Sequence, residues 1–272
     1  MTVRGSIAWQ LKAAGILFGG ALRGTAQYRA NLFLTMAAGA LFQTTGFLAL
    51  WVMLARFGDI AGWTITDVAL LYGIRLTAHG VWAVPFNQLM DVEHFVREGT
   101  FDRFLVRPVN PLVQLMTSRV RLNTLGDLVA GLVMLGVAMS HVDVDWTFGK
   151  LAFLLAALLG GAMVEGGIQL GLSAIAFRTL GSAQVRFTVD SVFNLYGNYP
   201  GSVFGRAGQW ALTILPVAFV AYLPTAVLLG RTGELGVPRI LAYLSPLVGA
   251  AVFAIAYAFW RRQIRHYQGA GS

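Results

Sequence analysis

The residues of this chain best suited to chemistry are a few polar side chains inside long apolar runs. Arg75 and His79 are one helical turn apart in one run, and Glu165 is expected at a similar depth in another. Asp190 and Asn194 have the same i, i+4 spacing, which places them on one helix face. An unpaired charge at the centre of a bilayer costs about 2.5 to 3.5 kcal/mol, so we expect Arg75 to pair with Glu165.

These polar residues have two interpretations. In the first, they line a substrate path or form a gate. In the second, Arg75 and Glu165 form a structural ion pair that holds two helices together, while a large amphiphilic cargo moves past along the helix faces. Reversal of both charges tests the pairing itself, because it should repair the damage caused by either single reversal.

Several other chemistries lack their motifs. A phosphate-binding P-loop needs Gly-x-x-x-x-Gly-Lys, and Val144 occupies the first glycine position before Gly149-Lys150. The histidines at positions 79, 94, 141 and 266 have no metal-binding spacing, and the chain has no cysteine. There is no Gly-x-Ser-x-Gly motif for a serine hydrolase. We therefore expect no catalytic residue, metal or cofactor in this chain.

The composition indicates a membrane protein. Of the 272 residues, 57% are hydrophobic and only 12% are charged, and the mean hydropathy is +0.66. Soluble domains contain about 25% charged residues. The net charge of +8 does not indicate a nucleic-acid-binding protein, because the basic residues stand between apolar runs and not on one amphipathic face.

A bilayer core about 30 Å thick requires a helix of about 20 apolar residues. Runs of this kind predict an all-α membrane protein with six transmembrane helices, at residues 30–54, 66–90, 122–140, 151–177, 187–203 and 240–260. A further apolar stretch at residues 211–229 contains Pro216 and Pro224, which break helical hydrogen bonding. We expect this stretch to be a re-entrant helical hairpin, whereas a full crossing would give seven spans.

The basic residues choose between six and seven spans. Six spans with a cytoplasmic amino end place most Arg and Lys residues inside, including Arg261, Arg262 and Arg265 of the tail. The positive-inside tendency favours this topology, because seven spans would put the basic tail outside. We therefore expect a multi-pass protein of the bacterial cytoplasmic membrane with both termini in the cytoplasm.

The residues before the first span follow a different pattern. Apolar side chains such as Ile7 and Leu11 recur at helical spacing among polar ones, which predicts a helix in residues 1–29 lying in the membrane interface. A cleaved signal peptide is the alternative, and Lys12 argues against it by interrupting the apolar region. No repeat or linker divides the chain, so residues 1–272 are expected to form a single transmembrane domain.

Glycines recur every four residues in two places. Gly197, Gly201 and Gly205 surround Pro200, and Gly167 is followed by a glycine four residues later in the fourth expected span. This spacing puts small residues on one helix face and lets neighbouring helices approach closely. Ordinary helix packing explains the pattern. The sharper alternatives are a subunit interface, or a hinge where Pro200 bends the fifth span.

The longest polar segment is expected between the second and third spans, at residues 91–121. It begins as an amphipathic helix that Gly99 can end, and Pro108 and Pro111 then favour an extended chain. Its charged and aromatic side chains suit a protein partner. A solvated loop without a partner fits the same pattern.

This segment resembles a known signature. One branch of ABC-2-type permeases, the membrane subunits of type V ABC exporters, has a cytoplasmic loop similar to the run Val96-Arg97-Glu98-Gly99-Thr100-Phe101-Asp102-Arg103-Phe104-Leu105-Val106-Arg107-Pro108. The fifth span and re-entrant region of that branch are similar to Asn198-Tyr199-Pro200, Leu215-Pro216 and Tyr222-Leu223-Pro224. With hydropathy included, the resemblance covers nearly the whole chain, and the Arg-x-Gly-x-x-Asp to Arg-Pro run is its specific part.

The resemblance implies a partner for the segment. In that family a coupling helix after the second span docks on a separate ATPase subunit, which binds ATP and Mg²⁺, and two identical or sibling permease chains form the path. Carried over by position, Phe101 and Asp102 would shape the turn after the helix. The docking residues would be Val92, Glu93, His94, Phe95, Val96, Arg97, Glu98 and Gly99.

Three functions follow from the sequence as hypotheses. The first is a permease subunit of an ATP-driven exporter, and the second is a secondary transporter or channel that needs no ATPase. Inverted repeats and broken midplane helices would favour the second, and the sequence shows neither clearly. The third is a membrane scaffold without transport. The resemblance implies a lipid, glycan, peptide or drug as cargo without choosing among them.

Overall fold

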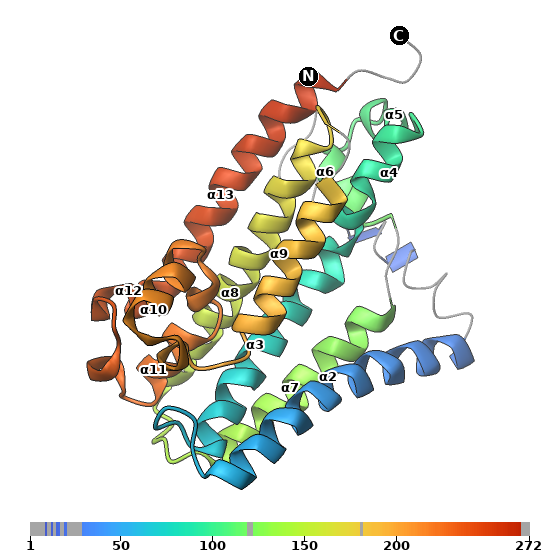
Figure 1. Ribbon diagram of the computed structural model, residues 1–272. Coiled ribbons are helices and arrows are strands. Elements are labelled where there is room, and N and C mark those ends of the chain that lie inside the picture. The colour runs from blue at the N-terminus through green and yellow to red at the C-terminus, as the bar shows by residue number, and fades with distance from the viewer. Residues whose placement is uncertain are drawn as a thin grey trace.

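The computed structural model describes residues 9, 12, 15, 16, 19, 20, 29–118, 122–179 and 182–267. Its five longest helices form the bundle in Figure 1: α2 (Arg29–Phe57), α3 (Ile65–Phe86), α7 (Leu122–His141), α8 (Phe148–Ile175) and α13 (Ser245–Gln263). The described residues contain no β-strand, and the isolated bridge between Ile60 and Trp63 is part of a turn. The expected all-α fold is confirmed.

Helix α3 lies inside the bundle, packed between α7 and α8. It begins at a capping box, in which the side chains of Thr64 and Asp67 each accept a hydrogen bond from the other's backbone amide. Gly73 and Gly80 allow close packing on α7, since an added Cβ would lie 2.8 Å from the Leu135 backbone and 2.6 Å from that of Leu128. Protein therefore surrounds most of α3.

Two glycines bring α8 and α13 into backbone contact. A Cβ added at Gly160 would lie 2.6 Å from the Cα of Pro246, and one added at Gly249 would overlap the carbonyl of Gly160. Small residues are favoured at such crossings because van der Waals packing, not exclusion of water, associates helices in lipid. Gly167, from the second glycine pattern, also faces α13, so its expected role in close packing is confirmed.

A group of short helices packs at one end of the bundle, at the lower left of Figure 1. The 3₁₀ helix η2 (Gly201–Phe204) continues into α10 (Gly205–Ile214), and η3 (Val217–Phe219) continues toward α11 (Tyr222–Leu228). These two arms meet at an angle of 89°, the geometry of a re-entrant loop or a broken span. Gln209 Oε1 ties the arms together, because it accepts hydrogen bonds from the Tyr222 hydroxyl (3.2 Å) and the Gly236 amide (2.7 Å).

The segment between α3 and α7 folds against the opposite end of the bundle. Its helices are η1 (Asn87–Asp91), α4 (Val92–Arg97), α5 (Asp102–Leu105) and α6 (Pro111–Met116). Phe101 and Phe104 join Phe177, Trp260 and Tyr267 in an aromatic cluster, in which the rings of Phe101 and Phe177 are 4.9 Å apart. The segment expected at residues 91–121 is therefore folded onto the bundle as far as it is described, to residue 118.

The expected spans correspond to helices with shifted ends. Residues 30–54, 122–140 and 151–177 match α2, α7 and α8, the three described helices that are long and apolar enough to cross a membrane. The bent pair formed by η2–α10 and η3–α11 would count as a fourth span. The number of six crossings stays a prediction.

The other three expected spans differ more from the helices observed. The second becomes α3 followed by η1, and the fifth becomes α9 (Ser182–Tyr196), which ends seven residues before its predicted end at residue 203. The last is split near Leu244 into α12 (Arg239–Tyr243) and α13. Short 3₁₀ turns, η4 (Thr232–Glu234) and η5 (Ile264–His266), stand before α12 and after α13.

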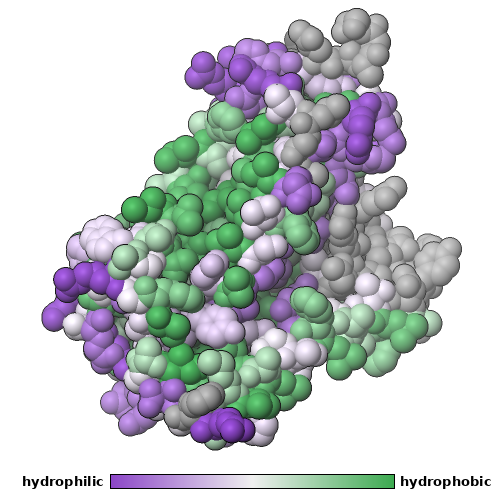
Figure 2. Space-filling view, in the orientation of Figure 1, coloured by the Kyte–Doolittle hydropathy of each residue, from purple (hydrophilic) through white to green (hydrophobic). Residues whose placement is uncertain are grey.

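The surface has the polarity that a bilayer requires. In Figure 2 hydrophobic side chains cover the middle of the visible face, and hydrophilic side chains gather at its ends. Large exposed apolar residues include Phe42 on α2 and Leu155 on α8, with 77% and 63% of their surfaces exposed. The interfacial helix expected at residues 1–29 lies outside the described residues, except for six helical positions between 9 and 20 and the first residue of α2.

Candidate functional site

A polar cluster made of Arg75, His79, Trp82 and Glu165 joins α3 to α8 inside the bundle. Arg75 Nη1 lies 2.8 Å from Glu165 Oε1, and His79 Nδ1 lies 2.9 Å from Oε2 of the same carboxylate. Trp82 donates its indole N–H to Glu165 Oε2 at 2.6 Å. Arg75 and Glu165 are almost completely buried. The expected pairing of Arg75 with Glu165 is confirmed, and His79 shares the carboxylate.

The polar cluster follows from helical spacing. Arg75, His79 and Trp82 are at positions i, i+4 and i+7, so all three lie on one face of α3. Gly166 of α8 faces Trp82, and an added Cβ there would lie 3.5 Å from the Cβ of Trp82, an ordinary contact distance. The sequence analysis did not select Trp82, although its position one turn beyond His79 is the signal that identifies it.

Helix α9 adds a third element to this site. Arg75 Nη2 donates to Asn194 Oδ1 at 3.4 Å, and Asn194 Nδ2 donates to Asp190 Oδ2 at 3.4 Å. The guanidinium carbon of Arg75 also lies 6.0 Å from the centre of the Phe193 ring. All five polar residues selected from the sequence are therefore brought together by α3, α8 and α9.

The sequence analysis did not select a further buried carboxylate, that of Asp127. Asp127 lies on α7, is 7% exposed and accepts a hydrogen bond from Gln43 of α2 at 3.2 Å. Gln43 also accepts, through its backbone carbonyl, a hydrogen bond from Tyr72 of α3 at 2.9 Å. The signal was present, because Asp127 is an acidic residue within an expected span. These contacts link α2 and α7 to α3.

The glycine repeat around Pro200 requires a correction. Helix α9 ends at Tyr196 and Pro200 begins a separate 3₁₀ turn, so Gly197, Gly201 and Gly205 do not share one helical face. Each has its own environment: Gly197 lies beside the Arg75 side chain, Gly201 faces the Tyr222 ring, and Gly205 has a φ of +63° that favours glycine. The suggested roles in a hinge or an interface stay predictions.

The residues expected to dock a partner divide into two sets. Val92 and Glu93 of α4 are buried, as is Phe101 after it, so these three contact the protein's own bundle. The exposed set contains charged residues, and within it His94 Nε2 lies 3.2 Å from Glu98 Oε2. Within residues 92–103, the exposed charged side chains are His94, Arg97, Glu98, Asp102 and Arg103.

The exposed set rests on an aromatic base. The guanidinium of Arg103 lies 4.9 Å from the centre of the Phe95 ring and 4.8 Å from that of Phe104. Phe104 in turn packs 5.5 Å from Phe101 of the aromatic cluster. These contacts connect Arg103, and with it the start of α5, to the aromatic cluster at the end of the bundle.

Arg186 connects this segment to α8 and α9. It lies in the first turns of α9, is 1% exposed, and donates from Nη1 to the Leu89 carbonyl (2.8 Å) and to Ser173 Oγ (3.2 Å). Its Nη2 donates to the Met90 carbonyl at 2.9 Å. From sequence, Arg186 was only one of the basic residues used to orient the chain.

The described residues contain no group of three His, Asp or Glu side chains that could hold a metal ion. The groups gathered around Glu165 instead neutralise and hydrogen-bond a buried carboxylate. Such satisfaction is what allows charges to remain inside a membrane protein.

Long apolar helices, a visible face that is apolar in its middle and polar at its ends, and charged groups buried against partners define the chain as an integral membrane protein built of helices. A family model described as "ABC-2 family transporter protein" matches residues 40–271. No curated protein and no solved structure matches the chain. Because the match covers most of its length, the chain belongs to the ABC-2 transporter family. It is therefore a transmembrane subunit of an ABC transporter, a class that normally acts with ABC ATPase subunits.

Proposed function

We propose that this chain is the permease subunit of an ATP-driven exporter of type V. Two permease chains, identical or siblings, form the translocation path within the lipid bilayer. Two separate ATPase subunits bind ATP and Mg²⁺ and dock on α4 and the turn after it. The chain thus supplies the path, and its partner supplies the energy.

The observation that carries this proposal is the exposed charged set on α4 and α5. One member, Arg103, lies over the rings of Phe95 and Phe104, and Phe101, in the turn between the two short helices, is buried in the aromatic cluster. A surface fixed in this way loses little side-chain freedom on binding, which favours recognition by a rigid partner. A loop that served only to connect two spans would not need such support.

The sequence supports the proposal that a separate subunit binds the nucleotide. The chain has no Gly-x-x-x-x-Gly-Lys motif, so a transporter driven by ATP takes its nucleotide site from another subunit. Two mixed-charge surfaces can attract and orient each other, and the presence of both Arg97 and Glu98 on the exposed set suits a partner surface with both signs of charge.

The membrane orientation is part of the proposal. The amino and carboxyl ends and the segment between α3 and α7 lie in the cytoplasm of a bacterial cell, where ATPase subunits are present. Arg261, Arg262 and Arg265 lie near that segment in the fold, because Trp260 and Tyr267 belong to the same aromatic cluster. This clustering of basic residues agrees with the positive-inside tendency.

Co-purification tests the docking. The tagged chain, expressed with its genomic neighbours, should recover a Walker-motif ATPase from detergent extracts. Arg97→Glu combined with Glu98→Arg should greatly reduce that recovery while membrane insertion stays unchanged. Arg206→Glu is the matched control, since Arg206 is an exposed arginine in α10, at the other end of the bundle.

Two results would contradict the proposal. One is labelling of a cysteine introduced at Thr100 by an impermeant reagent added outside intact cells, because the docking surface would then face away from the ATPase. The other is transport by the purified chain in vesicles without any ATPase, which is the behaviour of a secondary transporter or channel.

A further inference from the structure

The connection between α3 and α4 is hydrogen-bonded by the buried side chain of Arg186, which belongs to α9. Leu89 and Met90 lie in the 3₁₀ helix η1, where the hydrogen-bond pattern changes before α4 begins. Their carbonyls accept hydrogen bonds from the two terminal nitrogens of Arg186, at 2.8 Å and 2.9 Å. A planar guanidinium with fixed donor directions suits two carbonyls that are neighbours in the chain.

Helix α8 takes part in the same contact. Ser173 Oγ accepts a hydrogen bond from Arg186 Nη1 at 3.2 Å, and its single proton lies between the carbonyls of Gln169 (2.6 Å) and Leu89 (3.1 Å). The side chain of Arg186 therefore stands between η1, α8 and α9, with only 1% of its surface exposed. A buried guanidinium is costly unless its donors are satisfied, so displacement of any one element leaves donors or acceptors unpaired.

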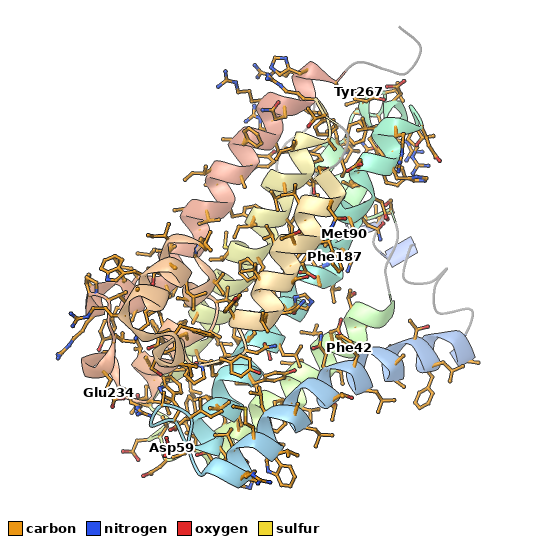
Figure 3. All side chains as sticks on the ribbon, viewed as in Figure 1. Phe42, Asp59, Met90, Phe187, Glu234 and Tyr267 are labelled. Atoms are coloured by element: carbon orange, nitrogen blue, oxygen red, sulfur yellow. The ribbon has the colours of Figure 1, made fainter. Side chains whose placement is uncertain are left out.

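A second contact binds α4 itself to α9. Ser182 Oγ, in the first turn of α9, donates to Glu93 Oε2 at 2.8 Å, and both side chains are buried. Ser182 and Arg186 are four residues apart and therefore lie on one face of α9. Figure 3 labels Met90 and Phe187 next to each other where η1 passes α9. The start of α9 is thus bonded to α4 through Ser182 and Glu93, and to η1, which precedes α4, through Arg186.

We propose that Arg186 and Glu93 are positioning residues that make α4 and α9 move as one body when the ATPase subunits change state. This inference rests on the proposed function and goes beyond it, because it names how a push on the docking surface reaches the membrane. Helix α9 carries Asn194, which hydrogen-bonds Arg75, so displacement of α9 acts directly on the polar cluster.

The inference also removes Glu93 from the docking surface. A side chain that is 8% exposed and bonded to Ser182 presents little surface to another protein. Substitution of Glu93 should therefore leave the ATPase bound, whereas substitution of Arg97 and Glu98 should release it. Docking and transmission are carried by different residues of the same short helix.

The test uses the complex of the full chain with its co-purified ATPase, reconstituted in lipid vesicles. The sequence has no cysteine, so Leu195→Cys, at the far end of α9 and 58% exposed, takes a single environment-sensitive bimane label. Emission is compared without nucleotide and with ATPγS plus Mg²⁺. The same comparison is made with Arg186→Gln, with Glu93→Gln, and with Arg178→Gln as control, since Arg178 is an exposed arginine in the turn after α8.

We expect ATPγS to shift the emission in the unsubstituted complex and in Arg178→Gln. The shift should be lost in Arg186→Gln and reduced in Glu93→Gln, whose amide still accepts from Ser182. Arg186→Lys keeps the charge and should restore part of the shift. ATPase recovery and melting temperature, measured on each variant, separate this loss from simple unfolding, which would lower both.

Three results would overturn the inference. The nucleotide-dependent shift persists in Arg186→Gln, or it is absent from the unsubstituted complex although the ATPase is bound, or it falls only in proportion to ATPase recovery. Failure of the proposed function looks different, because no ATPase is then recovered with the unsubstituted chain, and both proposals fall together.

Discussion

Helices α2 and α3 are neighbours in the sequence, yet most of α2 is exposed on the surface of the bundle whereas most of α3 is buried inside it. The most apolar part of α2 is only 11% buried, and its large side chains, such as Phe42, point away from the rest of the protein. Helix α3 carries Arg75 and His79 and is nearly surrounded by α7 and α8. In lipid, the apolar helix can stay outside while the polar helix must be covered by protein.

This contrast explains why α3, although its sequence was expected to cross the membrane, is not among the three described helices that are long and apolar enough to do so. A helix that faces other helices gains nothing from a fully apolar surface and can hold charged groups whose partners are provided by neighbours. Helix α2 has few such neighbours and depends on its own apolar surface. Substitutions in the two helices should therefore have very different effects.

The largest effect is expected for the ion pair. Glu165→Arg places a second positive charge beside that of Arg75, and loss of a buried pair's partner costs about 3 to 5 kcal/mol. We expect little folded protein from Glu165→Arg or Arg75→Glu alone. The double variant should recover much of it, as measured by size-exclusion chromatography of a fluorescent fusion.

Arg206→Glu provides the matched control for the ion pair, because it reverses an exposed charge outside the bundle core. If both single reversals yield as much folded protein as this control, the pair does not hold α3 to α8. The contrast between α2 and α3 would then lose its energetic basis.

A smaller effect is expected at Trp82. Trp82→Phe retains an aromatic ring but removes the donor that bonds Glu165 Oε2 at 2.6 Å. A hydrogen bond to a charged group contributes about 1.5 to 3 kcal/mol. The melting temperature in detergent should fall clearly, whereas Trp210→Phe, on the exposed side of α10, should leave it nearly unchanged.

The smallest effect is expected on α2. Phe42→Ala truncates a side chain that is 77% exposed, so the free energy of unfolding should change by no more than about 0.5 kcal/mol. Leu71→Ala, at a fully buried position of α3, should cost about 2 to 5 kcal/mol. A large loss from Phe42→Ala would mean that another protein surface, not lipid, covers this side of α2.

The sequence allowed the parts of the fold that depend on local pattern to be predicted. Apolar runs identified α2, α7 and α8, and the cost of an unpaired charge predicted that Arg75 meets Glu165. Both arguments use properties of a residue and its depth in the membrane. Neither requires knowledge of which helix faces which.

The parts that the sequence did not supply depend on tertiary contacts. Glu93 was carried over by position as a docking residue, and its burial and its hydrogen bond from Ser182, 89 residues away, have no local signal in the sequence. The glycines around Pro200 looked helical until the end of α9 at Tyr196 separated them. Arg186 looked like a topological charge, and only the position of η1 revealed its acceptors.

The crossing of α8 and α13 also limits how this chain can evolve. At Gly160 and Gly249 the two backbones touch, so even a single methyl group added at either position would force the helices apart. We expect the exposed apolar residues of both helices to tolerate exchange for other apolar types. Positions 160 and 249 can change only together with the spacing of the helices, and we expect them to vary as a pair or not at all.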